Sequence, residues 1–174
     1  LSKPGLTNND AYFRIQGRNA DGTLNSAYTN LVDVVNLIDY MLVIVYGGNL
    51  DAPISNFLSN TSPNNWYGMR NRTGPDGFRF FAHDSEHTLL DVNQNRMGPY
   101  SSGDSSVLKS NPQWAWQKMW ANQEFRILAA DRIHKHFFNG GVLTPQSARE
   151  RFLKRKNEID RAVVGESARW GDAR

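Results

Sequence analysis

The sequence predicts an α+β protein that is mainly helical, with a buried central helix, one β-hairpin and three helices toward the C-terminus. Residues 34–46 form a continuous, mostly apolar segment with the length and composition of a buried helix. Two short aromatic segments, residues 66–70 and 78–82, flank a turn rich in Gly, Pro and Asp, which predicts a hairpin. Capping residues followed by helix-forming segments occur at three later points in the chain.

The composition is that of a globular protein, and 174 residues fit a single domain spanning residues 1–174. The absence of cysteine excludes disulfide frameworks, thiolate metal sites and cysteine nucleophiles. No apolar segment approaches the roughly 20 residues that span a bilayer, so we expect no membrane span. Residues 149–174 carry eight Lys or Arg against five Asp or Glu and supply the whole net charge of +3. We interpret this basic segment as a solvated helix face and predict no nucleic-acid binding.

The first third of the chain predicts a polar lead-in and then the central helix. Residues 1–30 are rich in Asn, Gly and Thr, with one strand-like run at residues 12–15. Asp33 is the expected N-cap of the helix over residues 34–46, and Gly47 with Gly48 ends it. Because that helix is apolar nearly all round, we expect it to be the buried centre of the fold.

The remaining elements follow from capping and turn residues. A loop over residues 49–56 precedes the hairpin, and residues 93–110 form a long excursion rich in Gly, Ser and Asn. Asn111, Asn122 and Thr144 are the expected caps of the last three helices, two of which have proline at the next position.

Four side chains are candidates for chemistry: Asp51 and Asn56 in the loop after the central helix, and Asp84 and Glu86 after the second strand. Protein kinases use the same order of helix, Asp-x-x-x-x-Asn loop, hairpin and Asp. In that order the first Asp accepts the proton of the substrate hydroxyl, the Asn binds a metal ion, and the second Asp bridges metal and phosphates. The loop and the hairpin would bring both acids to one metal–phosphate centre.

The chain is also similar to the CotH (spore coat protein H) kinase family, over residues 12–172. The motifs that carry this resemblance are the segments 36–40 and 48–51, Asn56 with Phe57, Trp66 with Tyr67, the acidic cluster 84–86, and the closing segments 125–126 and 134–138. The resemblance implies the C-terminal lobe of an atypical kinase-like domain. It implies transfer of the γ-phosphoryl group of ATP, with Mg²⁺ or Mn²⁺, to Ser or Thr of secreted or surface proteins.

By this resemblance Asp51 is the base, Asn56 and Asp84 bind the cofactor, and Asn56, Asp84 and Glu86 hold the metal. The sequence departs from the family at Glu86, where the family has Asp, and at His83, where Trp is common. It also contains no Gly-rich loop or strand lysine to hold phosphates. We therefore expect an ATP-binding lobe upstream of residue 1, and we expect the 174 residues alone to be inactive.

Two other functions remain open. The first is a non-catalytic surface or adhesion module that kept the fold without turnover. The second is a small metallohydrolase centred on residues 83–87, in which His83 and His87 join Asp84 and Glu86 as metal ligands.

Overall fold

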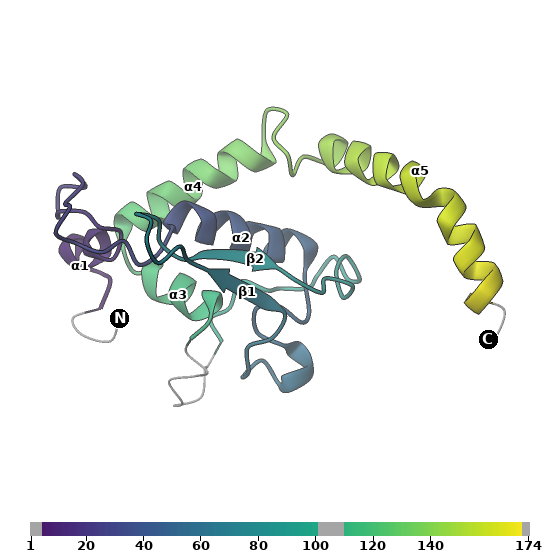
Figure 1. The fold of residues 1–174 in the computed structure, drawn as a ribbon, viewed down its shortest axis with the longest axis horizontal. Coiled ribbons are helices and arrows are strands. Elements are labelled where there is room, and N and C mark those ends of the chain that lie inside the picture. The colour runs from purple at the N-terminus through teal and green to yellow at the C-terminus, as the bar shows by residue number, and fades with distance from the viewer. Residues whose placement is uncertain (1–4, 101–109, 172–174) are drawn as a thin grey trace. The chain divides into compact units, whose positions relative to one another are not determined.

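A computed structural model describes residues 5–100 and 110–171, which form two compact units that divide between Arg132 and Ile133 (Figure 1). The described residues are mainly helical with one two-stranded antiparallel sheet, which confirms the predicted α+β class. The elements in chain order are α1 (Asn9–Arg14), α2 (Val34–Gly47), the short 3₁₀ helix η1 (Asn56–Leu58), β1 (Trp66–Met69), β2 (Arg79–Ala82), α3 (Pro112–Met119), α4 (Gln123–Phe137) and α5 (Pro145–Trp170).

Helix α2 begins and ends where the sequence predicts. The Asp33 carboxylate accepts a hydrogen bond from the backbone N–H of Asn36 at 2.9 Å, which caps the first turn. Gly48 adopts the left-handed conformation (φ 57°) that ends many helices. Both signals are local, and both are confirmed.

Helix α2 is the centre of the first unit, but its burial is one-sided rather than all round. It packs against β2 and α3, and Asp39 accepts a hydrogen bond from Nε of Arg132 on α4 at 2.8 Å. The other side of the helix remains partly open, since Val35 and Val43 are 41% and 49% exposed. The buried side chains are Val34, Leu37, Ile38, Tyr40, Met41, Leu42 and Ile44.

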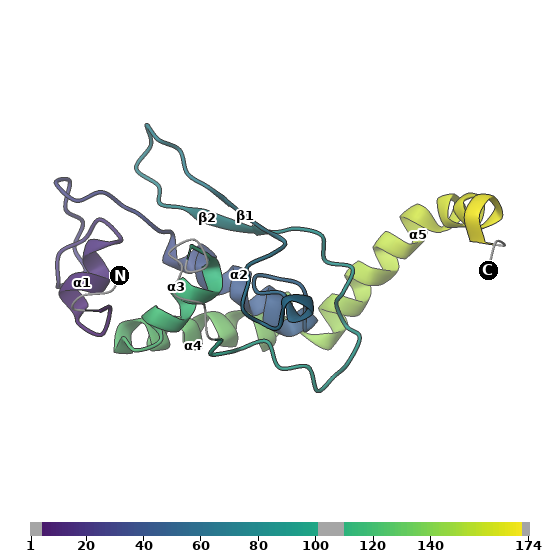
Figure 2. The same cartoon turned by 90° about the horizontal axis from the view of Figure 1, so that it is seen from below.

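The predicted hairpin is present and lies along α2 (Figure 2). Trp66 pairs with Ala82 and Met69 with Arg79. Strand β2 also forms a hydrogen bond with α2, because Phe80 N–H donates to the side-chain oxygen of Asn36 at 2.6 Å. A Cβ at Gly77 would lie 2.4 Å from the backbone of Val32, so only glycine permits this close approach.

The strand expected at residues 12–15 is wrong, because this segment belongs to helix α1. The Asn8 side chain accepts a hydrogen bond from Asp10 N–H at 2.6 Å and caps the helix. Tyr12 is then buried and contacts the edge of Phe125, with 6.4 Å between ring centroids. A four-residue run with two aromatic residues has a weak strand preference. The helix cap and the burial of Tyr12 on one side of the helix outweigh it.

The three C-terminal helices begin at the predicted residues. Asn111, Asn122 and Thr144 each accept hydrogen bonds from backbone N–H groups at the start of α3, α4 and α5. In the part of the chain that the structure describes, no helix combines the length and apolar character needed to cross a bilayer. Half of the predicted excursion at residues 93–110 lies outside the described residues, which exclude 101–109.

Candidate functional site

The loop that follows α2 is closed by backbone hydrogen bonds to itself and to the segment after the hairpin. Asn56 N–H donates to the carbonyl of Leu50 at 2.7 Å. Leu50 N–H donates to the carbonyl of His87 at 3.0 Å, and Leu89 N–H donates to that of Gly47 at 2.6 Å. The loop carrying Asp51 is thus attached to the segment that continues from Asp84.

Asp51 is nearly buried at 9% exposure, and its carboxylate accepts three side-chain hydrogen bonds. Ser55 donates from its hydroxyl to Oδ1. Asn64 and Asn65 donate to Oδ2 from their amide nitrogens, at 2.9 and 2.8 Å. An ionised carboxylate offers about four acceptor positions, so roughly one remains for a further donor. The carboxylate is therefore fixed in orientation and still able to accept one proton.

Asn65 connects Asp51 to Asp84. Its amide nitrogen, which donates to Asp51, also lies 3.3 Å from the backbone carbonyl oxygen of Asp84. Asn65 and Asp84 both have positive φ, at 44° and 46°. Asn and Asp tolerate this left-handed conformation better than most residues. Asn65 thus links the Asp51 carboxylate to the backbone of Asp84.

Asn56 and Glu86 lie differently from Asn65. The Asn56 side chain is exposed, and its oxygen accepts the amide of Asn60 at 3.3 Å. Glu86 is also exposed, and its Oε1 lies 3.1 Å from Nε2 of His87. The side chains that contact the Asp51 carboxylate from the strand side are Asn64 and Asn65. The roles of Asn56 and Glu86 as metal ligands stay predictions.

Arg96 is a buried cation beneath this loop that sequence analysis did not select. It is 1% exposed, donates to Asn60 Oδ1 at 2.9 Å and to the carbonyl of Ile54, and lies over the Tyr100 ring. Burial lowers the pKa of its guanidinium, while the nearby Tyr100 and Asp51 oppose that shift. An arginine remains charged even so, and Arg96 supplies a positive charge that balances the Asp51 carboxylate.

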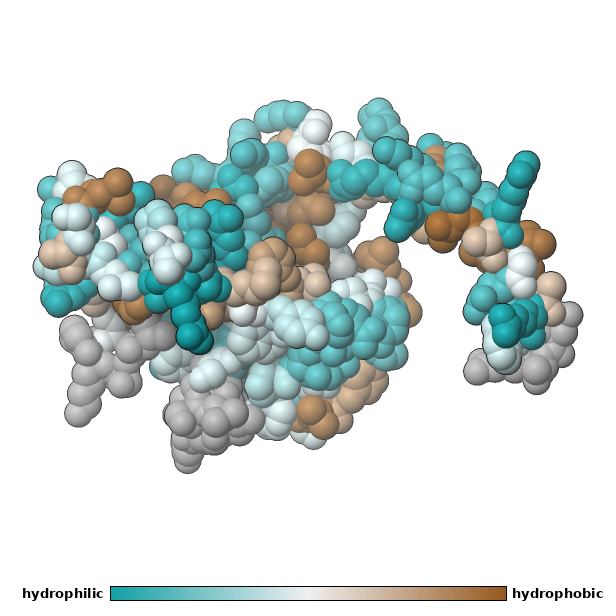
Figure 3. Space-filling model, in the orientation of Figure 1, coloured by the Kyte–Doolittle hydropathy of each residue, from teal (hydrophilic) through white to brown (hydrophobic). Residues whose placement is uncertain are grey.

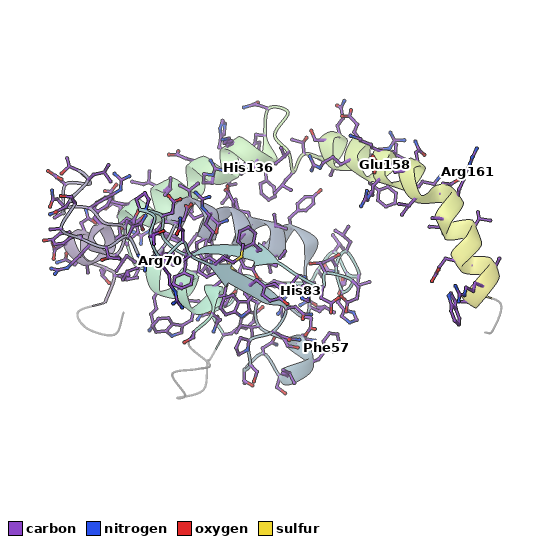
Figure 4. The ribbon with its side chains drawn as sticks, in the orientation of Figure 1. Phe57, Arg70, His83, His136, Glu158 and Arg161 are labelled. Carbon is purple, nitrogen blue, oxygen red and sulfur yellow. The ribbon has the colours of Figure 1, made fainter. Side chains whose placement is uncertain are left out.

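The two histidines of the 83–87 segment contact different aromatic rings. His83, just after β2, meets Tyr67 edge to face with 4.8 Å between centroids. His87 lies 4.8 Å from the ring of Phe57 on η1. Figure 4 shows His83 and Phe57 among the side chains around this end of the hairpin. Each imidazole therefore has its own aromatic neighbour.

The metal ligands predicted from the sequence at this site are oxygen donors. Within the described ranges, no three His, Asp or Glu side chains are grouped as ligands of one metal. A catalytic zinc ion needs about three protein ligands in one place. Mg²⁺ in phosphotransferases is held by one or two carboxylates and by substrate phosphates. The metal-binding role of the Asp84 carboxylate, which is exposed, stays a prediction.

Four side chains of the site went unselected in the sequence: Ser55, Asn64, Asn65 and Arg96. The two asparagines stand directly before the first strand, and that position was the one available signal. Arg96 lies in a Gly/Ser/Asn-rich segment, where no local pattern marks a buried cation. No protein-family model matches the chain, and neither a curated protein nor a solved structure matches it.

Proposed function

We propose that this chain is the catalytic-loop lobe of an atypical protein kinase of the CotH kind. The protein in its full natural length would transfer the γ-phosphoryl group of ATP to Ser or Thr of secreted or surface proteins. The observation that carries the proposal is the Asn65 amide, which lies within hydrogen-bond distance of both the Asp51 carboxylate and the Asp84 backbone. A base and a metal-binding acid on one rigid support are what phosphoryl transfer requires of a protein.

In this mechanism Asp51 accepts the proton of the acceptor hydroxyl. Ser55, Asn64 and Asn65 fix the direction of its carboxylate, so that its free acceptor position meets the incoming hydroxyl. The buried Arg96 supplies a positive charge near this carboxylate. The protein thereby orients the acceptor for an in-line displacement and removes its proton.

Asp84 would hold a divalent cation, with Asn65 and the predicted ligand Glu86 as further oxygen donors, and the substitution of Asn56 below tests whether Asn56 contributes. Such a cation neutralises charge on the phosphates during transfer. The carboxylate of Asp84 is exposed and its backbone is pinned by Asn65, so the ligand is accessible and held in place.

Transfer of labelled phosphate from ATP to a Ser-rich acceptor protein, with Mg²⁺ or Mn²⁺, tests the proposal in the full-length protein. Asp84→Asn should abolish transfer, because it removes the carboxylate that holds the cation. Asp51→Asn should lower kcat by at least about 100-fold with nucleotide affinity nearly unchanged, since a base acts mainly in the transition state. Asp84 is exposed, so its variant tests the mechanism without a folding defect.

Asp76→Asn is the matched control, because Asp76 is an exposed acid in the turn that joins the two hairpin strands. It should transfer phosphate at the wild-type rate. Equal activity of the Asp84 and Asp76 variants, or a full-length protein that neither binds ATP nor transfers phosphate to any acceptor, would exclude the kinase function.

A paired substitution distinguishes Asn65 from Asn56. Asn65→Ala should reduce kcat roughly 100-fold, because it removes one hydrogen bond to the Asp51 carboxylate and the contact with the Asp84 backbone at the same time. Asn56→Ala should change kcat by less than about threefold, since its side chain is exposed and bonds to Asn60. The reverse order would return the metal-ligand role to Asn56.

The second candidate is the non-catalytic binding module, and the outer face of the hairpin favours it. Tyr67, Met69 and Phe81 on that face are 57%, 63% and 41% exposed, and Tyr67 pairs directly with Phe81. Exposed aromatic side chains of this kind are enriched at protein interfaces. A protein that lacks transfer but loses target binding when Tyr67 and Phe81 become Ser would be such a module.

A further inference from the structure

Helix α5 presents a stripe of exposed apolar side chains. The structure describes every residue of this 26-residue helix, and none of them is buried. Phe152, Ile159, Val163 and Trp170 are 69%, 42%, 51% and 62% exposed. Figure 3 shows hydrophobic surface on α5 between hydrophilic side chains. A solvated helix has no need of large apolar residues aligned on one side.

The stripe follows the alternating three- and four-residue spacing of a coiled-coil seam. Its positions are Arg149, Phe152, Lys156, Ile159, Val163, Glu166 and Trp170. Positions with this spacing lie on one face of a helix and are the ones that meet a partner helix. Four of the seven are large and apolar, while Lys156 and Glu166 stand between them.

This seam matches itself when a second copy runs in the opposite direction. With the two-fold axis between residues 159 and 163, Phe152 faces Trp170 of the second copy, and Ile159 faces Val163. Lys156 then faces Glu166, so the two charged positions between the apolar ones also meet a complementary partner. A two-fold interface of this type uses the same patch on both subunits.

A parallel pair has no such match, because each position would face its own copy. Lys156 would meet Lys156 and Glu166 would meet Glu166, which is repulsive at both layers. The charge distribution along the helix agrees with the antiparallel arrangement. Residues 145–157 carry five basic side chains and one acidic, and residues 158–171 carry three acidic and two basic.

We propose that α5 is a self-association site, through which two copies of the chain form an antiparallel helix pair with this register. Its occupant is a second copy of the same helix. The Lys156 side chain, which in one chain lies 3.5 Å from Asp160 on the next turn, also reaches Glu166 of the partner in the pair.

Sedimentation velocity of the 174-residue chain over a broad concentration range tests this proposal. The wild type should form a dimer, and Ile159→Asp should keep the chain monomeric. Lys156→Glu should raise the dimer Kd about tenfold, because two attractive contacts per dimer become repulsive. Glu166→Lys should do the same. The double variant Lys156→Glu with Glu166→Lys should restore the wild-type Kd, since the pair is only exchanged.

Lys154→Glu is the control, because it makes the same charge change on the opposite side of the helix and should leave the Kd unchanged. Helicity measured by circular dichroism should be equal in all variants. A wild-type chain that is monomeric at every concentration overturns the proposal and indicates that another part of the protein covers the stripe. A dimer that tolerates both single charge reversals, or that the double variant fails to restore, also overturns it.

Discussion

Helices α2 and α5 start in the same way and are stabilised differently. Asp33 caps the first and Thr144 caps the second, each through a hydrogen bond to a backbone N–H three residues later. Yet α2 has seven buried side chains in 14 residues, and α5 has none in 26. Capping thus decides where a helix begins, while burial decides whether the helix belongs to a core.

We expect the largest difference between the two helices when one isoleucine in each is replaced by alanine and the free energy of unfolding is compared. Ile38→Ala on α2 should lower the free energy of unfolding by roughly 3 kcal/mol, because it leaves a cavity at a fully buried position. Ile159→Ala on α5 should change it by less than about 0.5 kcal/mol in the monomer, since the side chain is 42% exposed. Urea denaturation at a concentration that keeps the chain monomeric measures both. Similar losses for the two variants would mean that α5 is part of a folded core.

Removing the caps should have a smaller effect that again separates the helices. Asp33→Ala should cost about 1–2 kcal/mol, because the α2 N-cap disappears together with the 3.0 Å ion pair to Arg79. Thr144→Ala should leave the main unfolding transition in place and reduce only the helical circular dichroism signal, because fraying of α5 breaks no core contact. A shift of the main transition by Thr144→Ala would contradict this difference.

The smallest effect concerns the buried hydroxyl of Tyr40 on α2. The Tyr40 hydroxyl has no hydrogen-bond partner among the described residues, so Tyr40→Phe should change stability near neutral pH by less than about 1 kcal/mol, in the stabilising direction. Burial raises the pKa of Tyr40, and it raises the pKa of Tyr12 to about 12. Thermal unfolding measured as a function of pH reports the stability change of Tyr40→Phe near neutral pH and the loss of stability at high pH.

The contribution of a tyrosine with a raised pKa is fully present below about pH 10, where the unfolded chain also keeps its proton. It is lost as pH rises above 10, because the unfolded tyrosine then ionises while the buried one does not. Tyr40→Phe should therefore show a shallower loss of stability above pH 10 than the wild type. Tyr67→Phe, at an exposed position, should follow the wild-type curve. An identical slope for the wild type and Tyr40→Phe would contradict the buried state of this hydroxyl.

The candidate site shows how far local patterns reach. Asp51 and Asp84 were selected because a helix, a loop and a hairpin in that order are expected to bring two acids together, and the Asn65 amide contacts the Asp51 carboxylate and the Asp84 backbone. Asn56 was selected by its spacing from Asp51, but the asparagines that donate to the carboxylate are Asn64 and Asn65, 13 and 14 residues from Asp51. That contact depends on how the hairpin returns to the loop, which no sequence spacing specifies.

Burial was predicted less well than the positions of the elements. The run at residues 12–15 is helical because Asn8 caps it and Tyr12 finds a place against Phe125, and the second contact spans most of the chain. Arg96 is buried although the residues just before it, 93–95, are polar. Its guanidinium donates hydrogen bonds to the carbonyl of Ile54 and to the side chain of Asn60. Both outcomes depend on residues far away in the sequence.

The sequence by itself determined where α2 begins and ends, where α3, α4 and α5 begin, the hairpin and the α+β class. The helix signals come from side chains and backbone groups a few residues apart, such as Asp33 with Asn36 and the left-handed Gly48 that ends α2. Only the tertiary structure decided that α2 is open on one side, that Asn65 rather than Asn56 contacts Asp51, and that α5 is exposed throughout. The reason is physical: capping and turn energies are local, whereas burial and the convergence of polar groups depend on which distant segments share one core.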